Sequence, residues 1–120
     1  MVEKSRKCFV DVSPEELGIK RNHKKPDMPR AKELAKILKV ISVPHRLSIL
    51  RLIFGNPLPV CLISEALGVE QTLVSHHLAV LRREKLVKVK SRGKYRLYLA
   101  NEEKIYSIID SVLKYLMGEP

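Results

Sequence analysis

Residues 71–83 constrain the fold most, because their apolar and polar positions separate onto two opposite faces of a helix. Spacings of three and four residues define an apolar stripe of Val74, His77, Leu78 and Leu81. The opposite stripe comprises Gln71, Thr72, Ser75, His76 and Ala79, followed by Arg82 and Arg83. Small groups that donate and accept hydrogen bonds stand where a solvated face would carry Glu and Lys, and such groups match base edges in a DNA major groove. We therefore predict a helix that packs through one face, including His77, and contacts DNA through the other.

The residues before this helix predict its partner in a helix-turn-helix. An apolar segment at residues 60–67 ends at Gly68, which suits a helix C-terminus, and Val69-Glu70 opens the next helix. Many DNA-binding proteins present their recognition helix after such a glycine-containing turn.

Residues 87–99 predict a β-hairpin after the recognition helix. Val87 and Val89 alternate with lysines, residues 95–99 alternate in the same way, and the predicted turn at residues 91–94 contains Gly93. This hairpin is the wing of a winged helix-turn-helix.

Positive charge gathers on the same region. Between residues 82 and 96, eight Lys and Arg oppose one Glu, and the formal net charge of the chain is +10. A surface that only aids solubility normally mixes both signs, so this region favours a polyanionic partner. We expect phosphate contacts from Lys88, Lys90, Arg92, Lys94 and Arg96.

Apolar residues at helical spacing predict further helices at residues 30–43, at residues 44–54 after Pro44, and at residues 102–117. The predicted fold is mainly α with a small β-hairpin (α+β): a winged helix-turn-helix of five helices and a two-stranded wing. The apolar stripes on the first and last of these helices exceed what the three short helices and the hairpin can cover, which favours a second copy as partner.

Residues 1–29 show no sustained apolar period and include three prolines and several lysines and arginines. We predict a basic, partly disordered arm, in which Ser13 and Pro14 open one helical turn, before a domain at residues 30–120. No run of about eighteen apolar residues indicates a membrane span, and no secretory stretch follows the basic start. We therefore expect a cytoplasmic protein.

Several of these segments resemble the ArsR/SmtB family of winged-helix repressors. The resemblance rests on residues 67–71, on the Val-Ser-His-His-Leu sequence at residues 74–78 and on Leu81-Arg82, with further similarity at residues 44–50 and 86–99. It implies a sequence-specific regulator of double-stranded DNA, most simply a repressor. The family's DNA contacts fall on Gln71, Thr72, Ser75 and His76, and Arg82 follows them on the same helix.

The resemblance also implies a homodimer. In this family the first and last helices form a two-fold interface, which sets two recognition helices about 34 Å apart on an inverted-repeat operator. The residues expected in the interface are Leu34, Ile37, Ile105, Ile109, Val112 and Leu116.

The metal sites common in this family are not matched in this chain. One needs Cys-x-Cys followed by Asp, where residues 59–62 read Pro-Val-Cys-Leu. The other falls on Asn101, Glu103, Lys114 and Met117, and lysine and methionine do not suit a hard or borderline cation. We expect no bound metal and no cofactor, and His23 and His45 stand isolated with no predicted role.

Cys8 and Cys61 leave three alternatives for sensing. Two thiolates bind a thiophilic ion such as As(III), Cd(II) or Pb(II), or they oxidise to a disulfide that acts as a redox switch. Otherwise Cys61 is a small buried hydrophobe and Cys8 is an idle thiol. Whether any small-molecule or ion effector acts stays open.

Other classes of function are less favoured. No Gly-rich phosphate loop, carboxylate cluster or oriented triad accompanies the Ser75-His76 pair, so we do not expect an enzyme. A constitutive or architectural DNA-binding protein without an effector is the main alternative. An RNA-binding winged helix is less favoured, because aromatic residues for base stacking make up only 5% of the chain.

Overall fold

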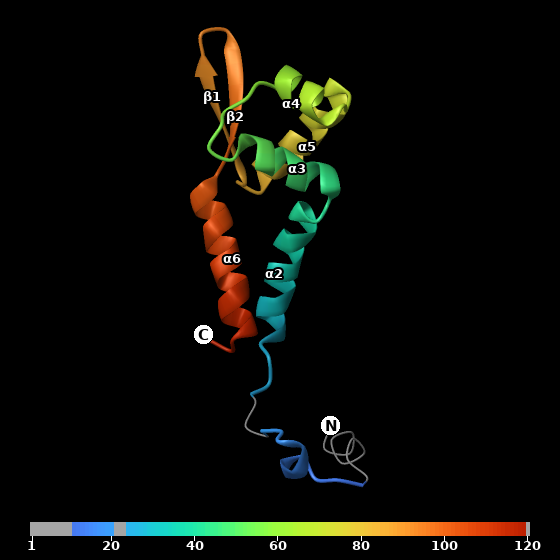
Figure 1. The fold of residues 1–120 in the computed structure, drawn as a ribbon. Coiled ribbons are helices and arrows are strands. Elements are labelled where there is room, and N and C mark those ends of the chain that lie inside the picture. Colours follow the sequence, from blue (N-terminus) through green and yellow to red (C-terminus); the bar gives the residue numbers. More distant parts are fainter. Residues whose placement is uncertain (1–10, 21–23, 120) are drawn as a thin grey trace.

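The computed structural model describes residues 11–20 and 24–119. In Figure 1, two long helices run side by side, and three shorter helices with the hairpin form a compact unit at one end of that pair. These residues contain the five α-helices and the antiparallel two-stranded hairpin that the sequence predicts. The elements are a short 3-10 helix η1 (Glu15–Leu17), α2 (Met28–Ile41), α3 (Pro44–Ile53), α4 (Val60–Leu67), α5 (Gln71–Arg83), β1 (Val87–Arg92), β2 (Tyr95–Ala100) and α6 (Glu102–Leu116).

Helix α2 begins and ends two residues earlier than predicted. The Asp27 side chain accepts a hydrogen bond from the backbone N–H of Arg30 at 3.1 Å and caps the helix. Pro29 therefore lies in the first turn, where a missing N–H leaves no helical hydrogen bond unmade, and the last two residues of the predicted arm are helical. At the other end Val43 is extended, because the residue before a proline disfavours the helical conformation.

The hydrophobic core lies inside the compact unit. Its fully buried side chains come from α3, α4 and α5 and from the segment that leads into β1, and they are Ile49, Ile53, Ile63, Val74, Leu78, Leu81 and Leu86. All four residues of the predicted α5 stripe are buried, so the expected packing face is confirmed. Burying a Val or Leu side chain contributes about 1.5–3 kcal/mol, and these contacts fix how α5 sits on the domain.

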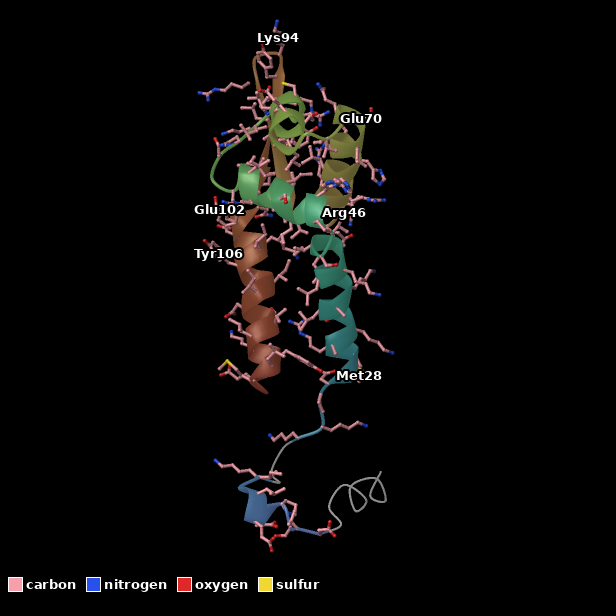
Figure 2. All side chains as sticks on the ribbon, turned by 45° about the vertical axis from the view of Figure 1, so that its right-hand side comes forward. Met28, Arg46, Glu70, Lys94, Glu102 and Tyr106 are labelled. Carbon is pink, nitrogen blue, oxygen red and sulfur yellow. The ribbon has the colours of Figure 1, made fainter. Side chains whose placement is uncertain are left out.

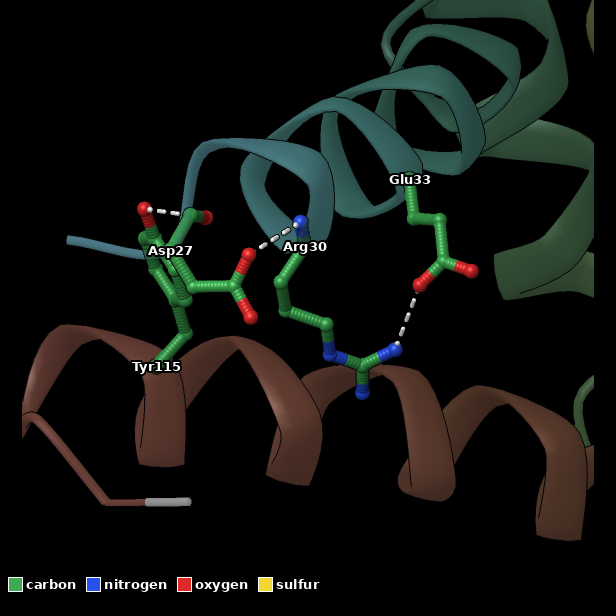
Figure 3. A network of polar contacts seen from close by, with 4 residues as sticks. All are labelled: Asp27, Arg30, Glu33 and Tyr115. Carbon is green, nitrogen blue, oxygen red and sulfur yellow. Dashed lines mark hydrogen bonds and ion pairs between the residues drawn. The ribbon is translucent and has the colours of Figure 1, made fainter.

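The far ends of α2 and α6 are tied together (Figure 3). The Tyr115 hydroxyl on α6 donates to the backbone carbonyl of Asp27 at 3.2 Å, and the side chain of Asp27 caps α2. Arg30 also pairs with Glu33 at 3.0 Å, but both side chains are exposed and such a pair contributes little to stability. One residue thus starts α2 and anchors it to the end of α6.

We expect Asp27→Ala to lower the free energy of unfolding by about 1 kcal/mol, because α2 loses its N-terminal acceptor. Asp27→Asn keeps a side-chain oxygen at that position and should retain most of the stability. Urea unfolding of the three proteins at pH 7 measures both effects. An equal loss in the two variants would show that the carboxylate charge, rather than the cap, is responsible.

Candidate nucleic-acid interface

A tight turn sets α5 against α4. Gly68 ends α4 at φ 65°, and its N–H bonds to the carbonyls of Ser64 and Glu65. The Ser64 hydroxyl donates to the carbonyl of Val69 and closes the turn. A Cβ at Gly68 would meet nothing within 4 Å, so glycine is favoured here by its left-handed backbone rather than by lack of space.

The face of α5 opposite the core is open to solvent. Gln71, Thr72, Ser75 and His76 are all exposed, as the two-faced pattern predicted, and their contact with DNA remains a prediction. Leu73 is also 39% exposed, an apolar side chain that the sequence analysis did not place on this surface. Arg82 and Arg83 are exposed in the last turn of the helix.

The hairpin register differs from the predicted turn. Arg92 pairs with Tyr95, so the turn consists of Gly93 and Lys94 alone, with Gly93 at φ 61°. The predicted four-residue turn at residues 91–94 was too long, because Ser91 and Arg92 continue β1. A bridge joins the backbones of Leu58 and Tyr98 through hydrogen bonds of 3.0 and 2.8 Å and holds β2 against the loop before α4.

This register divides the hairpin cations between two faces. Directly paired residues in an antiparallel hairpin share a face, so Arg96 lies with Ser91, on the face of Val89 and Tyr98. The other face carries the remaining three strand cations, Lys88, Lys90 and Arg92. Lys94 is at the tip (Figure 2). The five predicted phosphate contacts therefore do not form one continuous surface.

An open hollow of about 440 Å³ separates α5 from the hairpin. It is lined by Ser75, Leu78, Ala79, Arg82, Arg83, Arg96 and Tyr98, and no carboxylate is among them. The Arg96 guanidinium lies 5.8 Å from the centre of the Tyr98 ring, which helps to orient it. Within the described residues the two ion pairs lie on α2 and α6, so the cations around the hollow are not neutralised there.

His77 packs against α3 on the core side of α5. Its side chain is 8% exposed, as expected for a core histidine, and its Nδ1 accepts a hydrogen bond of 3.2 Å from Nε of Arg46. Burial first, and then the charge of Arg46 with the nearby His45 and His76, lower the pKa of His77 from its ordinary 6.5. The interpretation of His45 as isolated was wrong, because its ring meets His77 edge-on with centroids 5.6 Å apart.

Cys61 is exposed and carries a free thiol. The alternative that it is a buried hydrophobe was wrong, because Ile63 occupies the core side of α4 and Cys61 lies on the solvent side. Cys8 lies outside the described residues. Across residues 11–20 and 24–119, no three His, Cys, Asp or Glu side chains gather as a metal site would require.

Comparisons with known proteins agree with this geometry. The family described as "Bacterial regulatory protein, arsR family" matches residues 43–89. The HTH-type transcriptional regulator NmtR of Mycobacterium tuberculosis is 34% identical over 72% of each chain, and the arsenical resistance operon repressor of Staphylococcus xylosus is 39% identical over 60% of this chain and 69% of its own. The solution structure of apo-NmtR superposes with a TM-score of 0.59 at 33% identity, covering 82% of both chains.

A helix-turn-helix with an exposed polar second helix, followed by a cationic two-stranded hairpin, defines a winged helix-turn-helix DNA-binding protein. The chain belongs to the arsR family and is a DNA-binding transcriptional regulator, not an enzyme. In the part of the chain that the structure describes, no helix combines the length and apolar character needed to cross a membrane.

Proposed function

We propose that the protein is a homodimeric repressor that inserts α5 into the major groove of a specific inverted-repeat operator. The observation that carries the proposal is the exposed polar face of α5 beside a hollow lined by three arginines and no carboxylate. Side chains of this kind on a helix match the hydrogen-bonding groups of base edges, while guanidinium groups match phosphates. The name of the staphylococcal relative, an operon repressor, supports a repressing rather than an activating role.

Exposed apolar side chains on α6 support the dimer. Ile109, Leu113 and Leu116 are 51%, 52% and 73% exposed and lie on one face of the helix. Ile109 also lines an open apolar groove of about 520 Å³ between α2, α3 and α6. A contiguous apolar surface of this kind marks an interaction site, and a second copy brings a matching surface to it.

The interface residues expected from the sequence differ in how much surface they offer. Ile109 and Leu116 are exposed, whereas Ile37, Ile105 and Val112 are half-buried. Leu34 is 8% exposed in the single chain and packs within it, so little of its surface is left for a partner. Further exposed apolar residues lie around the same face but were not among the expected interface residues, and they are Leu38, Leu47, Phe54 and Leu113.

A mobility-shift titration separates the repressor from the architectural alternative. The probes are the DNA upstream of the protein's own gene and a random duplex of equal length, at one fixed salt concentration. We expect at least about a thousandfold tighter binding to the operator, the lower end for specific DNA-binding proteins. If six to eight phosphates are contacted, log K should fall with log salt at a slope of about −5 to −7. Equal affinity for both duplexes would refute operator recognition.

We expect Arg96→Ala to weaken binding to both duplexes by about tenfold and to flatten the salt slope by about 1.8. The loss of one phosphate contact from each protomer removes two contacts per dimer, each worth about 0.9 in slope. Arg92→Ala is the matched control, since Arg92 carries the same guanidinium on the opposite face of the hairpin. A larger effect at Arg92 than at Arg96 would mean that the hairpin presents its other face to the DNA.

A further inference from the structure

Arg46, near the start of α3, bridges two helices that have separate roles in the proposed function. Its Nη1 donates to the carbonyl of Val40 at 3.2 Å, and its Nε donates to Nδ1 of His77 at 3.2 Å. Figure 2 shows Arg46 at the level where α2 meets the compact unit. The Val40 carbonyl is among the last four of α2, which lack helical partners, and a cation is favoured at that end of a helix.

The contact with His77 depends on the charge state of the imidazole. Nδ1 accepts a hydrogen bond only when it carries no proton, whereas an imidazolium has N–H groups at both nitrogens. Protonation of His77 therefore removes the acceptor and sets a positive charge against the guanidinium of Arg46. The charged or titratable groups acting on the imidazole are Arg46 and His45 from α3 and His76 from α5, and together with burial they lower its pKa.

We propose that Arg46 is a positioning residue for DNA binding, which holds α5 against the end of α2 through His77 only while that imidazole is uncharged. The inference rests on the proposed function, in which α2 contributes to the dimer interface and α5 contacts DNA. The link therefore sets how far apart and at what angle the two recognition helices lie. His77 is on the core side of α5, so its protonation acts on DNA binding through the position of the helix.

The test is the pH profile of operator affinity for the full chain and for His77→Asn, whose amide oxygen replaces the Nδ1 acceptor and does not titrate. Groups that do not interact with His77 affect both dissociation constants equally and cancel in their ratio. From pH 7.5 to pH 5.5 the wild type should lose about fivefold more operator affinity than His77→Asn, because only the wild type loses the link between Arg46 and residue 77. An unchanged ratio would overturn the inference. His77→Gln serves as a second variant if His77→Asn does not fold.

Two further variants distinguish Arg46 from its neighbours. Arg46→Met keeps the apolar stem and removes both donors, and we expect about tenfold weaker operator binding at pH 7.5 that His77→Asn does not restore. His45→Gln removes the imidazole that touches His77 without accepting from Arg46, so its operator affinity should still fall at low pH as in the wild type. The fall should begin at a slightly higher pH, because His45 helps to lower the pKa of His77. A His45→Gln profile as flat as that of His77→Asn would overturn the inference, because the fall in affinity at low pH would then require His45.

Thermal unfolding without DNA provides an independent readout. The pKa of His77 is lower in the folded chain than its ordinary 6.5. Between these two pKa values the folded state therefore binds fewer protons than the unfolded state. The contribution of uncharged His77 to the free energy of unfolding is therefore complete above about pH 6.5 and is lost as the pH falls toward the lowered pKa. His77→Asn should not show this loss of stability. Failure of the wild type to bind any operator would refute the proposed function. Operator binding with parallel melting profiles for the two proteins would overturn this inference alone.

Discussion

Ile109→Glu is expected to convert the proposed dimer into a monomer and to weaken operator binding by about 100-fold or more. Ile109 lies on the exposed apolar face of α6 with Leu113 and Leu116. In a two-fold interface the substitution introduces two carboxylates, and each would be desolvated without a partner. A dimer that contacts two half-sites binds about 10²–10⁴ times more tightly than one protomer at a single half-site, and a monomer loses this gain in affinity.

Light scattering coupled to gel filtration measures the dimer, and titration of the operator duplex measures the binding. Ser107→Glu is the matched control, because Ser107 is exposed and lies on the opposite side of α6. Leu116→Glu repeats the test at the most exposed of the three apolar positions, where the fold of the single chain depends least on the side chain. A dimer that survives both apolar-to-Glu substitutions would place the interface elsewhere.

Helix α5 was predictable because its own residues define both its buried face and its exposed face. The apolar spacing at residues 74–81 admits a single helical phase, and that phase fixes which side chains remain exposed. Gly68 ends α4 at the predicted residue for an equally local reason, its positive φ. Local signals of this kind do not depend on the rest of the chain.

The hairpin faces and the His77 contact depend on partners distant in sequence. Residues 97–100 are all apolar, so alternation does not tell which of them face the core. The two-residue turn and the backbone bridge between Leu58 and Tyr98 determine which of these side chains face the core. They also place Arg96 on the opposite face of the hairpin from the other strand cations. Likewise Arg46 and His77 lie 31 residues apart, and packing of α3 on α5 brings them together. No local pattern predicts such pairs.

A double variant of α5, Ser75→Ala with His76→Ala, is expected to lose operator affinity by about 30-fold and to change affinity for random DNA much less. A lost base contact costs about 1–3 kcal/mol, and in the proposed dimer at least one such contact would be lost at each half-site. Two losses of about 1 kcal/mol correspond to a factor of about 30. Both side chains are exposed on α5, so the fold should not depend on them.

The contrast with Arg96→Ala makes this test specific, because a phosphate contact carries no sequence information and its loss should weaken both duplexes alike. Titrations of operator and random DNA at one salt concentration give the affinity of each variant relative to the wild type on both duplexes. Ser107→Ala lies on α6, away from the proposed DNA interface, and should leave both affinities unchanged. If the α5 double variant weakened both duplexes equally, Ser75 and His76 would contact the backbone rather than the bases. Specificity would then have to come from the remaining exposed residues of α5 or from the shape of the operator.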